Sequence, residues 1–171
     1  ASKGRFTLGI GLSHQVVIEK MFGLSYARQL SHMREYLSVL KPLLRGEPVK
    51  YRGEEYRVNA GLKPPGATPV PVVMAALGPK MLELCGREAT GTITWMAGHK
   101  ALSEHVIPRI TTAAREADCP PPRVIAGMPI AIANDTAKAH EVAAKVFQVY
   151  RDLPAYRTML DREGAAEPVD V

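Results

Sequence analysis

Cysteines and long apolar runs are scarce in this sequence, and each absence excludes a class of protein. The two cysteines, Cys85 and Cys119, lie far apart without a C-x-x-C spacing, so neither a disulfide framework nor a zinc site is indicated. No apolar run approaches the roughly 20 residues that a membrane-spanning helix needs, and the first residues lack the pattern of a signal peptide. We therefore expect a cytoplasmic protein that binds no metal and does not enter a membrane.

Clusters of basic residues are also missing, although the 171-residue chain carries a formal net charge of +5. Lysine and arginine are dispersed, and no run of them carries interleaved aromatic residues, so nucleic acid is not expected as a partner. A solvated surface is the favoured interpretation of these charges, and a mild attraction for an anionic ligand is the alternative. With 46% apolar and 23% charged residues, the composition is that of a globular domain with a real core.

Apolar periodicity predicts strands and helices in strict alternation. Short apolar runs predict strands at 6–10, 70–76, 92–96 and 124–133. Spacings of three and four predict helices at 26–45, from Pro79 onward, at 102–117 with a kink at Pro108, and at 136–152. Ser25 and the pair Asn134-Asp135 are the expected caps. The remaining segments are predicted to be a loop over 13–24, a hairpin around Gly53, and a polar tail over 154–171 with a short helical segment.

This alternation is typical of βαβ units and a parallel sheet. Right-handed crossovers leave two arrangements: a small open sheet, or part of a (β/α)8 TIM barrel, whose full form needs about 250 residues and eight strands. In the second arrangement, residues 1–171 are a single partial barrel domain that contains the middle and later strands. The hairpin is then a small insertion, and 154–171 is a polar C-terminal segment.

The first candidate site is the polar loop that follows the strand at 6–10. The run Gly9-Ile10-Gly11-Leu12-Ser13-His14-Gln15 completes neither a dinucleotide fingerprint nor a hydrolase elbow, because His14 and Gln15 stand where those motifs need glycine. The loop leaves a strand at its carboxyl end, the edge that faces ligands in α/β folds. Gly11, Ser13 and His14 are therefore candidates for ligand binding, and a solvated loop is the alternative. A serine hydrolase that uses Ser13 is a rival hypothesis, although no acid follows at the end of a later strand.

The second candidate site is the turn between the strand at 70–76 and the helix that Pro79 opens. Glycine allows the tight turn, the small alanines at 75 and 76 leave room beside the backbone, and Lys80 adds a positive charge. The free N–H groups of a first helical turn, here those of Gly78, Lys80 and Met81, form an anion site. The candidates for anion binding are Ala76, Leu77, Gly78, Pro79 and Lys80. An ordinary joint between strand and helix is the alternative.

The third candidate is Trp95, the only tryptophan, which ends a predicted strand on the same edge. Its ring can stack on a flat ligand, and packing in the core is the alternative. The other histidines lack metal-ligand spacing, so we expect surface or capping positions for His32, His99, His105 and His140. The charged run at 161–163 is expected to be solvated.

Three stretches occur in the order found in one known family: 4–11 at the first strand, 72–82 across the turn after the second, and 91–95 at the third. Between the first two lie a helix that ends at Gly46 and a hairpin around Gly53. Over nearly its whole length the sequence resembles the luciferase-like monooxygenase family, and within it the oxidoreductases that use the deazaflavin coenzyme F420. The resemblance implies a (β/α)8 barrel with the cofactor at the carboxyl ends of the strands.

The resemblance also implies roles for the candidate residues. The turn at 76–80 would hold the cofactor phosphate through backbone N–H groups, and Ser13 and His14 would face the cofactor or its tail, with Gly11 and Trp95 on the same edge. The implied activity is hydride transfer to or from F420 on an unknown small organic substrate, with a homodimer as the possible assembly. The alternatives are an FMN-dependent monooxygenase of the same fold, and a non-catalytic remnant or binding partner.

The sequence departs from the family pattern in two places. Thr90 stands where the family has an acidic residue, just before Gly91. Stretches similar to the family's first strands and last strand are missing. Because the early strands supply the residues around the reactive ring, no catalytic acid or base is assigned, and we interpret the sequence as a fragment.

Overall fold

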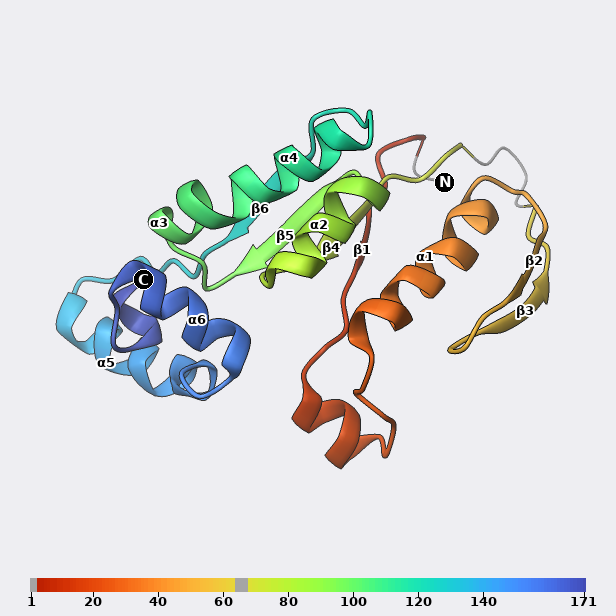
Figure 1. The fold of residues 1–171 in the computed structure, drawn as a ribbon. Helices are drawn as coiled ribbons and strands as arrows, with labels where there is room; N and C mark the ends of the chain where they lie inside the picture. Colours follow the sequence, from red (N-terminus) through yellow and green to blue (C-terminus); the bar gives the residue numbers. More distant parts are fainter. Residues whose placement is uncertain (1–2, 64–67) are drawn as a thin grey trace.

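The structure is a computed structural model that describes residues 3–63 and 68–171 (Figure 1). At its centre is a parallel sheet of four strands, β1 (Leu8–Ile10), β4 (Val72–Ala75), β5 (Gly91–Trp95) and β6 (Arg123–Gly127). The longer helices are α1 (Gln29–Leu44), α2 (Pro79–Glu88), α4 (Ile107–Glu116), α5 (Thr136–Phe147) and α6 (Pro154–Glu163). A short α3 (His99–Ala101) and the π-helical turn Leu102–Val106 lead into α4. The antiparallel hairpin predicted around Gly53 consists of β2 (Val49–Arg52) and β3 (Arg57–Ala60).

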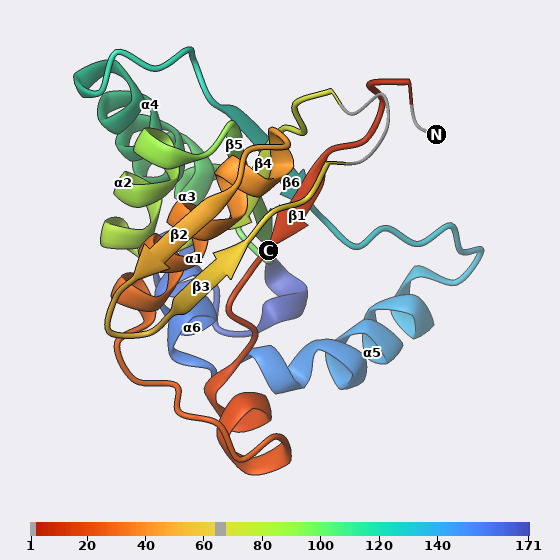
Figure 2. The ribbon, with the colours of Figure 1, turned by 90° about the vertical axis from the view of Figure 1, so that its right-hand side faces the viewer.

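The strand order explains how the helices are placed. The sheet runs β1-β4-β5-β6, so each strand pairs with the next sheet strand along the chain. A doubly wound sheet would instead reverse its order at a switch point. A single core joins Leu37 of α1, Leu82 of α2 and Ile110 of α4 to Met74 of the sheet, and Figure 2 shows α2 and α4 on one side of the strands. Right-handed crossovers that leave the helices on one face are the winding of a barrel.

Strands β4 and β5 each place a buried residue on this covered face and an exposed neighbour on the other. Met74 and Thr92 are fully buried, and the Thr92 hydroxyl donates to the Met74 carbonyl at 2.8 Å. Their neighbours Ala75 and Ile93 point to the opposite face and are exposed. Behind the sheet, Cys85 is fully buried, and burial raises the pKa of its thiol to about 12.

The hairpin is attached to α1 through a buried carboxylate. Glu35 accepts hydrogen bonds from the backbone N–H groups of Glu54, Glu55 and Tyr56 at 2.9 to 3.0 Å. Gly53 lies against the same carboxylate, and a Cβ at this position would overlap with it. Burial raises the pKa of Glu35, but the three N–H donors and the charge of Arg28 outweigh it, so the pKa lies below its ordinary value.

Replacing Glu35 with glutamine should lower the melting temperature by several degrees near pH 7, because three buried N–H groups lose a charged acceptor. The folded pKa of Glu35 is lowered, so its contribution to stability is present above the unfolded pKa and is lost as pH falls through the folded value. The difference between wild type and variant should therefore shrink toward pH 3 in thermal unfolding. Glu47→Gln, at an exposed carboxylate paired with Arg45, is the matched control and should change little. A constant difference across the pH range would contradict the role of the charge.

Two predicted boundaries are wrong for local reasons. α1 begins at Gln29 instead of 26, because Arg28 has a left-handed backbone (φ 54°), and Ser25 accepts a hydrogen bond from the N–H of Ala27 instead of capping the helix. The strand predicted to reach 133 ends at Gly127, and Pro129 follows closely without an N–H for the ladder.

Three further segments differ from the prediction in their helical structure. The loop expected over 13–24 contains a π-helical turn, Val16–Met21. Pro108 lies in the first turn of α4, directly after the π-helical turn Leu102–Val106, in place of a mid-helix kink. α5 ends at Phe147 and is followed by the 3₁₀ turn Gln148–Tyr150, while its predicted cap is confirmed, since Asp135 accepts the N–H of Lys138 at 2.9 Å. No helix within the described residues is long and apolar enough to cross a bilayer.

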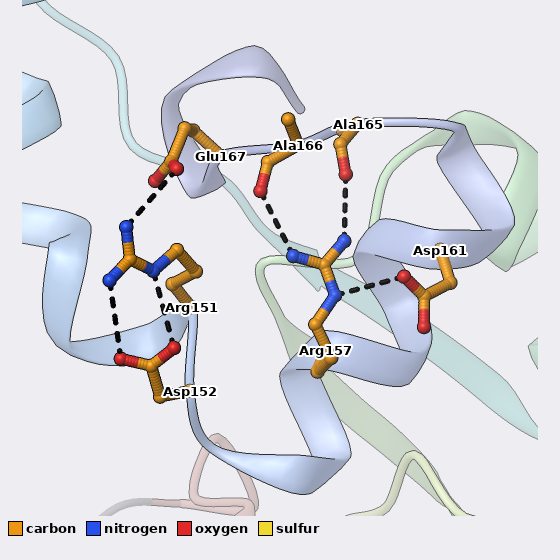
Figure 3. Close-up of polar contacts among 7 residues, drawn as sticks. All are labelled: Arg151, Asp152, Arg157, Asp161, Ala165, Ala166 and Glu167. Atoms are coloured by element: carbon orange, nitrogen blue, oxygen red, sulfur yellow. Dashed lines mark hydrogen bonds and ion pairs between the residues drawn. The ribbon is translucent and has the colours of Figure 1, made fainter.

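The C-terminal segment is held together by two arginines (Figure 3). Arg157 donates to the Asp161 carboxylate at 2.9 Å and to the carbonyls of Ala165 and Ala166 at 2.8 and 2.9 Å. Arg151 pairs with the carboxylates of Asp152 and Glu167. These contacts fix α6 and the short 3₁₀ turn Pro168–Asp170.

The same segment packs against the rest of the molecule, which its polar composition did not predict. α6 buries Met159 and Leu160. Glu163, expected to be solvated, accepts hydrogen bonds from the N–H groups of Ala101 at 2.6 Å and Lys100 at 3.2 Å. Glu163 therefore connects α6 to the start of α3, just after β5.

Candidate functional site

The carboxyl ends of β1, β4 and β5 meet at one edge of the sheet (Figure 1). The parallel register pairs Ile10 with Met74 and Ala75 with Ile93, so the segments that follow these strands leave the sheet side by side. Gly11 lies directly against the end of β4, since a Cβ at Gly11 would stand 3.0 Å from that of Ala75. The structure thus brings the loop at 11–14, the turn at 76–80 and Trp95 to one edge.

The turn before α2 has the geometry of an anion site. Gly78 is the N-cap residue with an extended backbone (φ −72°, ψ 149°), and Pro79 opens the helix. The N–H groups of Gly78, Lys80 and Met81 form no hydrogen bond within the described part of the chain. A Cβ at Gly78 would meet no atom within 4 Å, and Lys80 is exposed. Three N–H donors and one cation are therefore accessible to a ligand.

The loop after β1 is held by two tyrosines. Ser13 has a left-handed backbone (φ 61°), and its carbonyl accepts a hydrogen bond from the Tyr26 hydroxyl at 2.8 Å. His14 is half-buried, with its ring centre 5.7 Å from that of Tyr156. Strained backbone of this kind clusters at functional sites, which favours the ligand-binding interpretation over a free loop. Among the described residues no histidine bonds to Ser13, so the nucleophile and base pair of a serine hydrolase is not formed.

A row of aromatic rings runs along this edge from Trp95 to His14. The ring of Trp95 lies 6.1 Å from that of Phe147 and 6.3 Å from that of Tyr150. Tyr150 in turn lies 4.9 Å from Tyr156, which contacts His14. Sequence reasoning missed Tyr150 and Tyr156, because they belong to the C-terminal segment and reach the edge only through the tertiary fold. The row forms one wall of the candidate site.

The polar groups of this wall are suited to donating hydrogen bonds. Burial raises the pKa of the Tyr156 phenol, and the nearby phenols of Tyr150 and Tyr26 raise it further, so its hydroxyl stays protonated. The indole Nε1 of Trp95 is buried without a partner among the described residues. An unsatisfied buried donor costs about 1–3 kcal/mol, so this group is a candidate donor to a ligand.

His105 is buried, although we expected a surface or capping position for it. Its ring is 2% exposed, and Nε2 lies 2.7 Å from the carbonyl oxygen of Leu77, inside the 76–80 turn. Burial lowers the pKa of the imidazole, the Leu77 hydrogen bond raises it, and the charges of Arg162 and Arg109 lower it further, so the net shift is downward. The spacing of apolar residues along a helix does not predict such a contact, because the contact depends on how the helices pack on the sheet.

The remaining histidines behave more simply. His99 and His140 are exposed, as expected, and Nε2 of His32 lies 2.8 Å from the Tyr56 hydroxyl. Within residues 3–63 and 68–171, no three His, Cys, Asp or Glu side chains gather in a group that can hold a metal ion.

Comparison with known proteins places this geometry in a family. A model of the luciferase-like monooxygenase family matches residues 1–170. The chain belongs to this family. The 5,10-methylenetetrahydromethanopterin reductase of Archaeoglobus fulgidus is 30% identical over 97% of this chain and 50% of its own length. The chain therefore spans about half the length of the curated relatives it matches.

Solved structures agree with the winding of the sheet. The coenzyme F420 dependent tetrahydromethanopterin reductase from Methanopyrus kandleri superposes with a TM-score of 0.78 at 26% identity, over 96% of this chain and 52% of that one. The oxygenating constituent of 3,6-diketocamphane monooxygenase of Pseudomonas putida, in complex with FMN, has a TM-score of 0.66 at 20% identity, over 99% and 54%, and shows the fold alone. The family resemblance is confirmed, and the four strands are part of a (β/α)8 barrel.

Proposed function

We propose that the chain is the cofactor-holding part of an oxidoreductase that transfers a hydride to or from coenzyme F420, with a small organic molecule as substrate. The observation that carries the proposal is the open first turn of α2 at the carboxyl edge of the sheet, where Gly78, Lys80 and Met81 offer N–H groups that have no acceptor among the described residues. The likeness to F420-dependent relatives supports the choice of cofactor. A homodimer, a single domain and a cytoplasmic location remain predictions from the sequence.

The residues of the turn fit a phosphate. Its negative charge would be held by three N–H groups and the positive end of the helix dipole, with Lys80 nearby. Ala76 and Gly78 present little or no side chain, so the backbone can approach the phosphate closely. We assign Leu77 and Pro79 the shaping of the turn, since Pro79 fixes the first helical residue and has no N–H to contribute.

The loop and the aromatic row fit the remainder of the cofactor. Gly11, Ser13 and His14 would line its path from the phosphate along the edge. The Trp95 indole offers a flat apolar surface and a donor that has no partner in the part of the chain that the structure describes. When bound, the deazaflavin supplies the hydride chemistry. The part of the chain that the structure describes then binds and orients the cofactor, and none of its side chains is assigned as catalytic acid or base.

Titration with the cofactor should quench the emission of Trp95, which as the only tryptophan reports on this edge alone. We expect saturation at micromolar F420 and weaker binding of FMN, whose shorter tail carries less negative charge. Inorganic phosphate in excess should compete, because it occupies the same turn. Tighter binding of FMN would favour the flavin alternative. No response to either compound would contradict the proposed cofactor site.

A further inference from the structure

The buried His105 reaches the proposed phosphate turn from behind. It lies in the π-helical turn before α4, and its Nε2 atom is 2.7 Å from the Leu77 carbonyl oxygen. Its other nitrogen, Nδ1, is 3.1 Å from Nε of Arg109. An arginine N–H can only donate, so Nδ1 must be the acceptor, and the single proton of the neutral ring sits on Nε2. His105 therefore donates a hydrogen bond to Leu77.

This hydrogen bond fixes the orientation of a peptide plane. The structure has no cis peptide bonds among its described residues, and in a trans peptide the C=O and the following N–H point in opposite directions. Because His105 holds the Leu77 carbonyl toward the interior, the N–H of Gly78 must point outward. A flipped peptide would instead present a carbonyl oxygen to the ligand, and this oxygen repels an anion.

We infer that His105 is a positioning residue of the cofactor site, which keeps the Leu77–Gly78 peptide turned so that Gly78 donates to the cofactor phosphate. The inference rests on the proposed function, since it assumes that the turn receives the phosphate. The ring is itself held in place, because Arg109 contacts Nδ1 and also lies 4.0 Å from Glu83 of α2. Burial of the ring and the nearby charges of Arg162 and Arg109 lower the pKa of the imidazole and so disfavour a positive charge on it.

Two amide substitutions at His105 separate its hydrogen bond to Leu77 from its contact with Arg109. In His105→Gln, the longer side chain can place its NH₂ group near Leu77 and so retain the donor. In His105→Asn, the shorter side chain reaches Arg109 but falls short of Leu77. Both variants bury an amide of similar polarity, so thermal unfolding should report similar losses of stability. F420 affinity should fall roughly tenfold in His105→Asn and stay within about threefold of wild type in His105→Gln.

The backbone N–H of Gly78 supplies a second measurement that needs no cofactor. Its backbone amide resonance, followed by NMR, should shift or broaden in His105→Asn and should return to its wild-type position in His105→Gln, because only a donor to Leu77 holds the Leu77–Gly78 peptide in one orientation. Equal affinities and equal Gly78 resonances in both variants and wild type would overturn the inference. Equal losses of affinity in both variants, in proportion to their melting temperatures, would also overturn it. If wild type itself binds neither F420 nor FMN, the proposed function fails, and the role of His105 toward the phosphate fails with it.

Discussion

Replacing Gly78 with aspartate should remove most of the affinity for F420 while leaving the fold intact. Gly78 is the N-cap residue of α2, and aspartate at an N-cap accepts hydrogen bonds from the second and third helical residues, here Lys80 and Met81. The new carboxylate would therefore occupy the donors that we assign to the phosphate and would repel it. Losing hydrogen bonds to a charged group costs about 1.5–3 kcal/mol, or roughly ten- to a hundredfold in Kd.

The fold should tolerate this change because the space around Gly78 is open and its φ of −72° suits any residue. Gly78→Ala is the matched control: it adds a Cβ without a charge and should bind F420 nearly as well as wild type. Fluorescence titration gives the affinities, and circular dichroism checks that the helices are retained. Unchanged affinity in Gly78→Asp, with the fold retained, would show that the cofactor phosphate does not bind at this turn.

The largest effect on stability is expected from Gly86→Ala in α2. Gly86 is buried where α2 crosses α4, and an added Cβ would overlap with the Ile110 carbonyl and stand 2.9 Å from the Cβ of Ala113. Helix propensity alone predicts the opposite, because alanine is favoured over glycine by about 1 kcal/mol inside a helix. The overlap involves backbone atoms, which cannot move without shifting α4, so the steric term should prevail and destabilise by about 1–3 kcal/mol.

Urea denaturation measures this difference, and Gly78→Ala again serves as the control, since its Cβ enters open space. The control should lose less stability, about 1 kcal/mol at most, because alanine is less favoured than glycine at an N-cap but meets no steric overlap here. A Gly86→Ala variant more stable than wild type would contradict this prediction. It would show that α2 and α4 can separate enough to accommodate the added Cβ without loss of stability.

The features that depend on neighbouring residues could be predicted from the sequence. The presence and order of the four strands follow from short apolar runs, and the start of α2 follows from Gly78 and Pro79, whose roles at a helix start are local. The same holds for the cap at Asp135. The shared edge of the three candidate segments followed in turn from parallel strands, whose carboxyl ends coincide.

The features that were missed depend on contacts between distant segments. His105 lies in a helical pattern that is also compatible with the surface, and only the packing of its helix turns the ring toward Leu77. Tyr150 and Tyr156 reach the site because the C-terminal segment folds back on the carboxyl edge of the sheet, where Glu163 connects it to α3. The spacing of apolar residues along the sequence does not predict these contacts.

The aromatic row has a consequence for the order in which the molecule folds. The pairing of β5 with β6 and the packing of α2 against α4 involve segments that are close in the sequence, so this part of the molecule can form early. The aromatic row depends on contacts between distant segments, because His14 and Tyr156 come from opposite ends of the chain and β1 must pair with β4 before the row can form. Closing such long loops is slow. The aromatic row at the candidate site is therefore completed after the rest of the sheet, and the environment of Trp95 becomes native only when folding is finished.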